Sequence, residues 1–244
     1  MEKQALAKPT PVVTHVLSQR NMQWYLGTQV ISLTGMMLRQ AVLSLLMIDL
    51  VGVKNAPPLV GMIWALNVLP GTIMGIFAGM MVDHFDKRRI LQTTAVLGII
   101  QGLILVYITR GRDMHNLPEH IAIWKIMSVM LFTGITNAID GICRNAIVAD
   151  AVLHEENKSM GSIIFSCLYT FGMVLGNGLA GWLVENIGYS NTFILNASSF
   201  LFLIIGLSQM SFKHNKTKKK DHGVFEGALH RIKIGILYTF TQDS

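Results

Sequence analysis

Six long apolar stretches are the feature that most constrains what this chain can fold into. They run over residues 24–50, 58–82, 90–109, 121–142, 160–184 and 192–210. Because a transmembrane helix needs about 20 mainly apolar residues, each stretch is long enough to cross a bilayer. Only 14% of the residues are charged, whereas a soluble domain has about a quarter. The sequence therefore predicts an all-α, polytopic membrane protein with six transmembrane helices.

The stretches divide the chain into three parts. We expect a cytoplasmic leader over residues 1–23, a transmembrane domain over 24–211 and a basic cytoplasmic tail over 212–244. The first stretch is too long for a signal-peptide core and has no small-residue cleavage site at its end, so we interpret it as an uncleaved signal anchor. The basic residues of the tail indicate either an interfacial helix that binds anionic lipid or the positively charged flank of the last span.

The basic residues indicate how the helices are oriented, since cytoplasmic loops are enriched in Lys and Arg. If the N-terminus is inside, only Lys54, Arg110 and Arg112 lie on the outer side, while Arg39 and Lys125 lie within spans. The other fifteen of the 20 basic residues then face the cytoplasm. We therefore expect a multi-pass protein of the cell membrane with both termini cytoplasmic. The net charge of +6 needs no nucleic-acid partner.

The connection after the second stretch carries a specific motif. It reads Gly79-Met80-Met81-Val82-Asp83-His84-Phe85-Asp86-Lys87-Arg88-Arg89. This resembles G-x-x-x-D-R-x-x-R-R, the loop between helices 2 and 3 of the major facilitator superfamily, with His84 in place of the first Arg. Gly79 permits close approach of another helix, and the three bases hold the loop at the inner surface.

Further segments resemble the bacterial exporter branch of that superfamily, which includes enterobactin-exporter-like and macrolide-efflux-like proteins. They are Ser32-Leu33-Thr34-Gly35 with Leu69-Pro70, Cys143-Arg144-Asn145-Ala146, and Leu175-Gly176-Asn177-Gly178-Leu179-Ala180-Gly181. The family usually has Pro where Cys143 and Asn177 stand. The resemblance covers residues 24–211 and implies two inverted three-helix repeats, which is half of a major facilitator fold.

The resemblance implies membrane transport without covalent chemistry. We expect the N-terminal half of a secondary active exporter, an antiporter in which a proton gradient drives efflux of a small amphipathic molecule by alternating access. Besides the lipid bilayer and the substrate, its partner would be a C-terminal half or a second copy. The alternative is a truncated or non-transporting six-helix membrane module that binds a partner chain.

An intramembrane enzyme is disfavoured, and no cofactor or metal is expected. The segment from Gly176 to Gly181 formally matches G-x-G-x-x-G, but it lies inside an apolar helix rather than after a strand, which favours helix packing. The eight histidines lack metal-ligand spacing, and Cys143 and Cys167 offer neither a disulfide framework nor a zinc site.

Polar residues recur at helical spacing inside the apolar stretches. Because an unpaired charge in hydrocarbon costs at least about 2.5 kcal/mol, such stripes should face protein or water. We expect the substrate cavity to be lined by Ser32, Arg39, Trp64, Asn67, Asn137 and Asn177. The alternative for Arg39 is that it pairs with a neighbouring helix or extends toward the outer headgroups.

Charged and small residues near the cytoplasmic side suggest a gate. We expect it to be formed by Gly79, Asp83, Lys87, Arg88, Asp140 and Arg144. Asp140 and Arg144 are four residues apart and meet on one helical face, which suits either a gate with a proton-linked role or a simple structural ion pair. Gly71, Gly75 and Gly79 favour close packing against a neighbouring helix in this chain or in a second copy.

Overall fold

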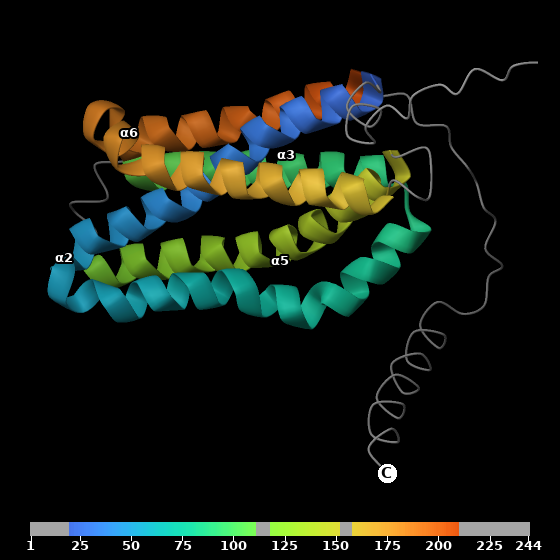
Figure 1. Cartoon of the computed structure of the whole chain (residues 1–244). Helices are drawn as coiled ribbons and strands as arrows, with labels where there is room; N and C mark the ends of the chain where they lie inside the picture. The colour runs from blue at the N-terminus through green and yellow to red at the C-terminus, as the bar shows by residue number, and fades with distance from the viewer. Residues whose placement is uncertain (1–19, 111–117, 152–157, 210–244) are drawn as a thin grey trace, which may run out of the picture. The chain divides into compact units, whose positions relative to one another are not determined.

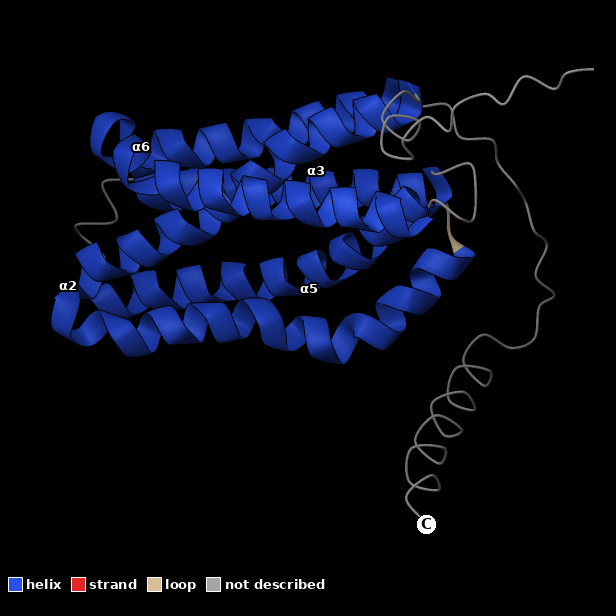
Figure 2. Ribbon diagram, viewed as in Figure 1, coloured by secondary structure: helices blue, strands red, loops and turns tan. Residues whose placement is uncertain are grey.

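The computed structural model describes residues 20–110, 118–151 and 158–209, which are almost entirely helical (Figure 2). The helices are α2 (Arg20–His84), α3 (Lys87–Arg110), α5 (Glu119–Ala151) and α6 (Lys158–Gln209) (Figure 1). By its contacts the chain divides into residues 1–211 and 212–244, and every described residue belongs to the first unit. Residues 1–19 of the expected leader and the whole expected tail lie outside the described residues.

Two of the helices contain a sharp break at a glycine. Gly52 in α2 has φ 76° and Gly188 in α6 has φ 78°, a backbone region that glycine enters without a Cβ penalty. Figure 1 shows the chain reversing direction at both points, at the same end of the bundle. We call residues 20–51 and 53–84 the first and second arms of α2, and residues 158–187 and 189–209 the first and second arms of α6. At each of the two breaks the chain therefore turns at a single residue.

The arms of α2 and α6 and the helices α3 and α5 pack through close backbone approaches. A Cβ added to Gly176 of α6 would lie 2.6 Å from the carbonyl oxygen of Thr34 and 2.7 Å from the amide nitrogen of Leu38. A Cβ added to Gly134 of α5 would lie 2.9 Å from the carbonyl oxygen of Asn67. Because lipid provides no hydrophobic drive for helix association, such small-residue contacts carry much of the packing.

The apolar core lies toward the end where the two breaks occur. Its buried members come from both arms of α2, from α3 and α5, and from both arms of α6. They include Leu43, Leu46, Met47, Leu105, Ile126, Met130 and Phe193. The core therefore joins all four labelled helices, while the opposite half of the bundle contains buried polar groups.

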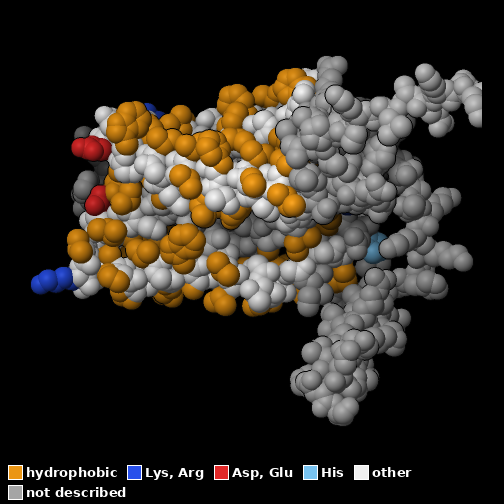
Figure 3. Space-filling model, viewed as in Figure 1, with side chains coloured by type: hydrophobic (Ala, Val, Ile, Leu, Met, Phe, Trp, Pro, Cys, Tyr) orange, Lys and Arg blue, Asp and Glu red, His pale blue; other side chains and the backbone are white. Residues whose placement is uncertain are grey.

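The outer surface of the helices is apolar. Four helical stretches are long and apolar enough to cross a membrane, and only 22–44% of their most apolar windows is buried inside the protein. Large side chains such as Val53, Ile73, Tyr107 and Trp124 are strongly exposed. Figure 3 shows hydrophobic side chains along the helices on this face, with charged side chains gathered at the end near the two breaks. A lateral apolar belt of this kind is matched to lipid.

Candidate functional site

The centre of the polar half is an ion pair within α5. Nε of Arg144 donates to Oδ2 of Asp140, one helical turn earlier. Arg144 is 1% exposed and Asp140 is 5% exposed. Burying both charges requires that their remaining hydrogen-bonding groups also find partners, because an unpaired buried charge is costly.

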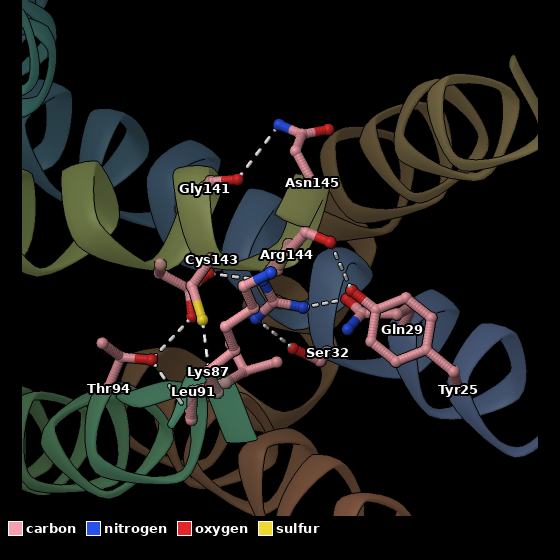
Figure 4. Close-up of polar contacts among 11 residues, drawn as sticks. Tyr25, Gln29, Ser32, Lys87, Leu91, Thr94, Gly141, Cys143, Arg144 and Asn145 are labelled. Atoms are coloured by element: carbon pink, nitrogen blue, oxygen red, sulfur yellow. Dashed lines mark hydrogen bonds and ion pairs between the residues drawn. The ribbon is translucent and has the colours of Figure 1, made fainter. Parts of the chain in front are cut away.

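The first arm of α2 supplies the other partners of Arg144. Its two terminal nitrogens donate to Oε1 of Gln29 and, at 3.0 Å, to Oγ of Ser32. The hydroxyl of Tyr25 donates to the main-chain carbonyl of Arg144 at 3.0 Å. Tyr25, Gln29 and Ser32 follow one another at intervals of four and three residues, so they lie on one face of this arm. Figure 4 shows the three side chains directed at Arg144.

Helix α3 holds the acidic member of the pair. Oγ1 of Thr94 donates to Oδ1 of Asp140 at 2.8 Å, so both carboxylate oxygens are engaged. Nearby, the thiol of Cys143 donates to the carbonyl of Lys87 at 3.0 Å, where α3 begins. We call Tyr25, Gln29, Ser32, Thr94, Asp140 and Arg144 the Arg144 cluster. It fixes α2, α3 and α5 to one another through charge-assisted bonds, which are the stronger kind.

A second polar cluster surrounds Arg39. One terminal nitrogen of Arg39 donates to Oε1 of Gln101 at 3.1 Å. Gln101 also accepts from Thr133 at 3.2 Å and donates through Nε2 to Thr136 at 2.9 Å. The guanidinium carbon lies 5.8 Å from the centre of the Phe200 ring, within reach of a cation–π interaction. Within the described residues, the contacts of Arg39 are thus to an amide and an aromatic ring and not to a carboxylate.

A cavity of about 500 Å³ lies between both arms of α2, α5 and the first arm of α6. Its polar lining comes from Gln40, Asn67, Asn137, Asp140, Arg144, Asn145, Ser166, Tyr169 and Thr170. Its apolar lining comes from Leu33, Met36, Met37, Trp64, Val68, Phe165 and Met173. A volume of this size holds a small organic molecule, and mixed lining with a few polar groups is typical of ligand sites.

The structure brings some of the residues expected in a substrate site together and not others. Trp64, Asn67 and Asn137 line the cavity. Ser32 is buried behind its wall, where it binds Arg144. Arg39 does not line the cavity, since it is 3% exposed and engaged with Gln101 and Phe200. Asn177 is exposed on α6 and is likewise not among the lining residues.

The residues expected in a gate fall into two groups. Asp140 and Arg144 line the cavity and form the buried ion pair, whereas Gly79, Lys87 and Arg88 lie around the α2–α3 connection. Arg88 donates to the carbonyl of Ser208 at 3.0 Å. The contact of Cys143 with Lys87 joins the two groups.

The connection itself is fixed at the start of α3. Asp86 accepts the amide of Arg88 at 3.0 Å, which is an N-cap bond. The side chain of Asp83 lies outside the described residues.

Several site residues were not singled out from the sequence. Gln29 and Tyr25 complete the Arg144 cluster, Gln101 is the centre of the Arg39 cluster, and Gln40 lines the cavity. The available signal was polarity alone, because a glutamine within an apolar span needs a protein or water partner. If every glutamine of the spans is included among the polar residues, the sequence identifies Gln29, Gln40 and Gln101.

Comparison with protein families gives a match over most of the chain. A family profile described as Major Facilitator Superfamily matches residues 8–241 of the chain. No curated protein matches its sequence.

Proposed function

Because the chain belongs to the Major Facilitator Superfamily and is therefore a membrane transport protein, we propose that it forms the N-terminal half of a secondary active exporter. The half moves a small amphipathic molecule by alternating access, and a proton gradient drives the antiport. The observation that carries this proposal is the cavity of about 500 Å³, which four helical segments surround and a buried ion pair borders.

In the proposed topology each arm of α2 and α6 crosses the membrane, as do α3 and α5. This makes six spans in two inverted three-helix repeats. The positions of Gly52 and Gly188 at one end of the bundle support the arrangement (Figure 1). The basic run Lys87, Arg88 and Arg89 begins α3 at the end of the second arm, which favours a cytoplasmic location for that end and for both termini in the cell membrane.

In the proposed site, Trp64, Asn67 and Asn137 contact the substrate directly. Ser32 acts from behind the wall by holding Arg144. Arg39 binds Gln101, and neither residue lines the cavity, so Arg39 holds the first arm of α2 against α3 rather than contacting the substrate. The Arg144 cluster forms the inner part of the cytoplasmic gate, connected through Cys143 to Lys87 at the start of α3. Asn177 has no contact with the cavity to support a substrate role.

The test is gradient-driven accumulation of amphipathic fluorescent dyes in proteoliposomes that contain the chain, as a self-associated species or combined with a complementary half. We expect accumulation that collapses with a protonophore. Asn137→Leu should abolish it, whereas Asn186→Leu should not, because Asn186 is exposed, does not line the cavity and donates to Trp182 of its own helix. Normal transport by Asn137→Leu would contradict the site, and no accumulation from either preparation would contradict the exporter.

A second candidate function is a non-transporting membrane module that binds a partner chain. A Cβ added at Gly75 or Gly79 would meet nothing within 4 Å, so these small residues make no close approach within the described part of the chain. Residues of this spacing commonly seat another helix. Cross-linking in membranes tests it: Gly75→Leu should abolish association with a partner or a second copy and leave the thermal stability of the chain unchanged.

A further inference from the structure

We propose that the cavity selects molecules without net charge, which present an aromatic or apolar body and a hydrogen-bond acceptor that the side-chain amide of Gln40 binds. This inference rests on the proposed function, in that it takes the cavity as the binding site of the transported molecule. It adds the chemical class of the substrate and a residue that determines specificity.

The charges that border the cavity are already satisfied. Asp140 and Arg144 are the charged members of its lining among the described residues. Both carboxylate oxygens of Asp140 accept hydrogen bonds, and each of the three guanidinium nitrogens of Arg144 donates one. A charged ligand would have to leave water for a site whose opposite charges are already paired, and this desolvation is unfavourable. The cavity therefore disfavours both cations and anions.

Gln40 lies at the wall of the cavity and has a buried donor without a partner among the described residues. The residue lines the cavity and is 7% exposed. Its Oε1 accepts from Nδ2 of Asn67 at 3.2 Å, which fixes the amide, and its buried Nε2 has no hydrogen-bond partner in the described part of the chain. A buried amide without a partner is unfavourable. Since an amide NH₂ can only donate, the complementary group on a ligand is an acceptor such as a carbonyl or ether oxygen.

The other polar groups of the lining impose no comparable requirement. The hydroxyls of Ser166 and Thr170 donate to carbonyls of their own helix, at 2.9 and 3.0 Å. Asn145 likewise donates to Gly141 at 3.0 Å. Asn137 and Tyr169 have groups that can either donate or accept. Gln40 is thus the residue that discriminates between a ligand with an acceptor and one without.

The walls suit an aromatic or apolar body. Trp64 and Tyr169 line the cavity and are 47% and 39% exposed, so their rings remain available for contact. Met36, Met37 and Met173 also line the cavity. Methionine is flexible and polarisable and makes favourable contacts with aromatic rings. We infer that the shape of the apolar body is recognised loosely, while its charge and its acceptor are recognised strictly.

The experiment measures ligand binding to the full-length chain by fluorescence of Trp64. Trp24→Phe, Trp124→Phe and Trp182→Phe leave Trp64 as the reporter, and none of the three replaced residues lines the cavity. The probes share one fused aromatic body and differ in one substituent, which is a ketone, a methyl group, a quaternary ammonium or a sulfonate. We expect the ketone probe to bind about tenfold more tightly than each of the other three probes. A tenfold difference in affinity corresponds to the contribution of one net hydrogen bond.

Two variants of Gln40 and a matched control test whether Gln40 is responsible for the preference for the ketone probe. Gln40→Leu should remove the advantage of the ketone over the methyl probe, and Gln40→Glu should make the ammonium probe the tightest ligand. Gln23→Leu should leave the order of affinities of the four probes unchanged, because Gln23 is exposed and does not line the cavity. The reporter protein with Gln40 intact already tests charge selection, so that test does not depend on how well a Gln40 variant folds.

The outcomes separate this inference from the proposed function. Binding of the ammonium or sulfonate probe as tight as that of the ketone would overturn the inference and leave the cavity as a binding site. A ketone preference that survives Gln40→Leu would overturn the role of Gln40. If no probe alters Trp64 fluorescence, the cavity is not the ligand site, and the proposed function fails together with the inference.

Discussion

The hydroxyl of Tyr25 donates to the main-chain carbonyl of Arg144 at 3.0 Å. Tyr25 thus binds the backbone of the same residue whose side chain is bound one and two turns later by Gln29 and Ser32. The first arm of α2 therefore holds both the position of α5 and the direction of the Arg144 side chain. This double attachment is what places Asp140 and Arg144 at the wall of the cavity.

Removing one member of the buried ion pair should strongly destabilise the fold. We expect Arg144→Leu to lower the free energy of unfolding by about 3–5 kcal/mol, because it leaves Asp140 charged and buried. The double variant Asp140→Leu/Arg144→Leu should be less damaging than Arg144→Leu alone. Denaturant unfolding in detergent measures both, and equal stability of the single and double variants would contradict the ion-pair argument.

Arg39 should matter more for stability than for ligand binding. Arg39→Leu removes the bond to Gln101 and the contact with Phe200, and we expect a loss of about 1–3 kcal/mol. Arg39→Lys keeps the charge and should lose less. Because Arg39 does not line the cavity, the ketone affinity reported by Trp64 should stay within about twofold of its original value. A large loss of affinity in a variant of normal stability would show a direct substrate role.

Gly176 and Gly178 of α6 should differ in how strongly their replacement by alanine affects stability. A Cβ at Gly176 would lie 2.6 Å from the carbonyl oxygen of Thr34, whereas one at Gly178 would meet nothing within 4 Å. We expect Gly176→Ala to destabilise the fold by about 1–3 kcal/mol. Gly178→Ala should be neutral or slightly stabilising, since alanine favours the helix. Thermal unfolding of the two variants gives the comparison, and similar melting temperatures would be inconsistent with the packing described.

The two breaks should depend on glycine. Gly52→Ala and Gly188→Ala place a Cβ on residues with φ 76° and 78° and ψ 159° and 168°, a backbone region essentially restricted to glycine, at an expected cost of about 1–3 kcal/mol each. Gly61→Ala is the control, because Gly61 lies within the second arm of α2 and its Cβ would meet nothing within 4 Å. Unfolding measurements that find all three variants alike would mean that the reversals do not require this backbone conformation.

The orientation can be tested with single cysteines in a background where Cys143 and Cys167 are replaced by alanine. Asn55, three residues beyond the break in α2, and Arg89, near the start of α3, are both exposed. We expect Asn55→Cys to react with a membrane-impermeant thiol reagent in intact cells, and Arg89→Cys to react only after permeabilisation. The opposite labelling pattern would reverse the topology.

Hydropathy and motif together were enough to predict the membrane class and the superfamily. The apolar stretches predicted helices that overlap α2, α3, α5 and α6, and the motif that begins at Gly79 pointed to the family that matches residues 8–241. These properties are local, because a span of about 20 apolar residues has few alternatives to a helix in lipid. The same applies to Asp140 and Arg144, whose spacing along one helix predicts that they meet.

Only the tertiary structure decided which polar residues reach the cavity. Ser32 and Arg39 lie seven residues apart on one face of the first arm of α2, yet Ser32 binds Arg144 of α5 and Arg39 binds Gln101 of α3. Asn137 lines the cavity, whereas Asn177 faces outward. A periodic pattern shows that residues share a face, but the rotation of each helix against its neighbours decides what that face meets. That rotation is set by close approaches such as Gly176 against Thr34, which involve residues far apart in the chain.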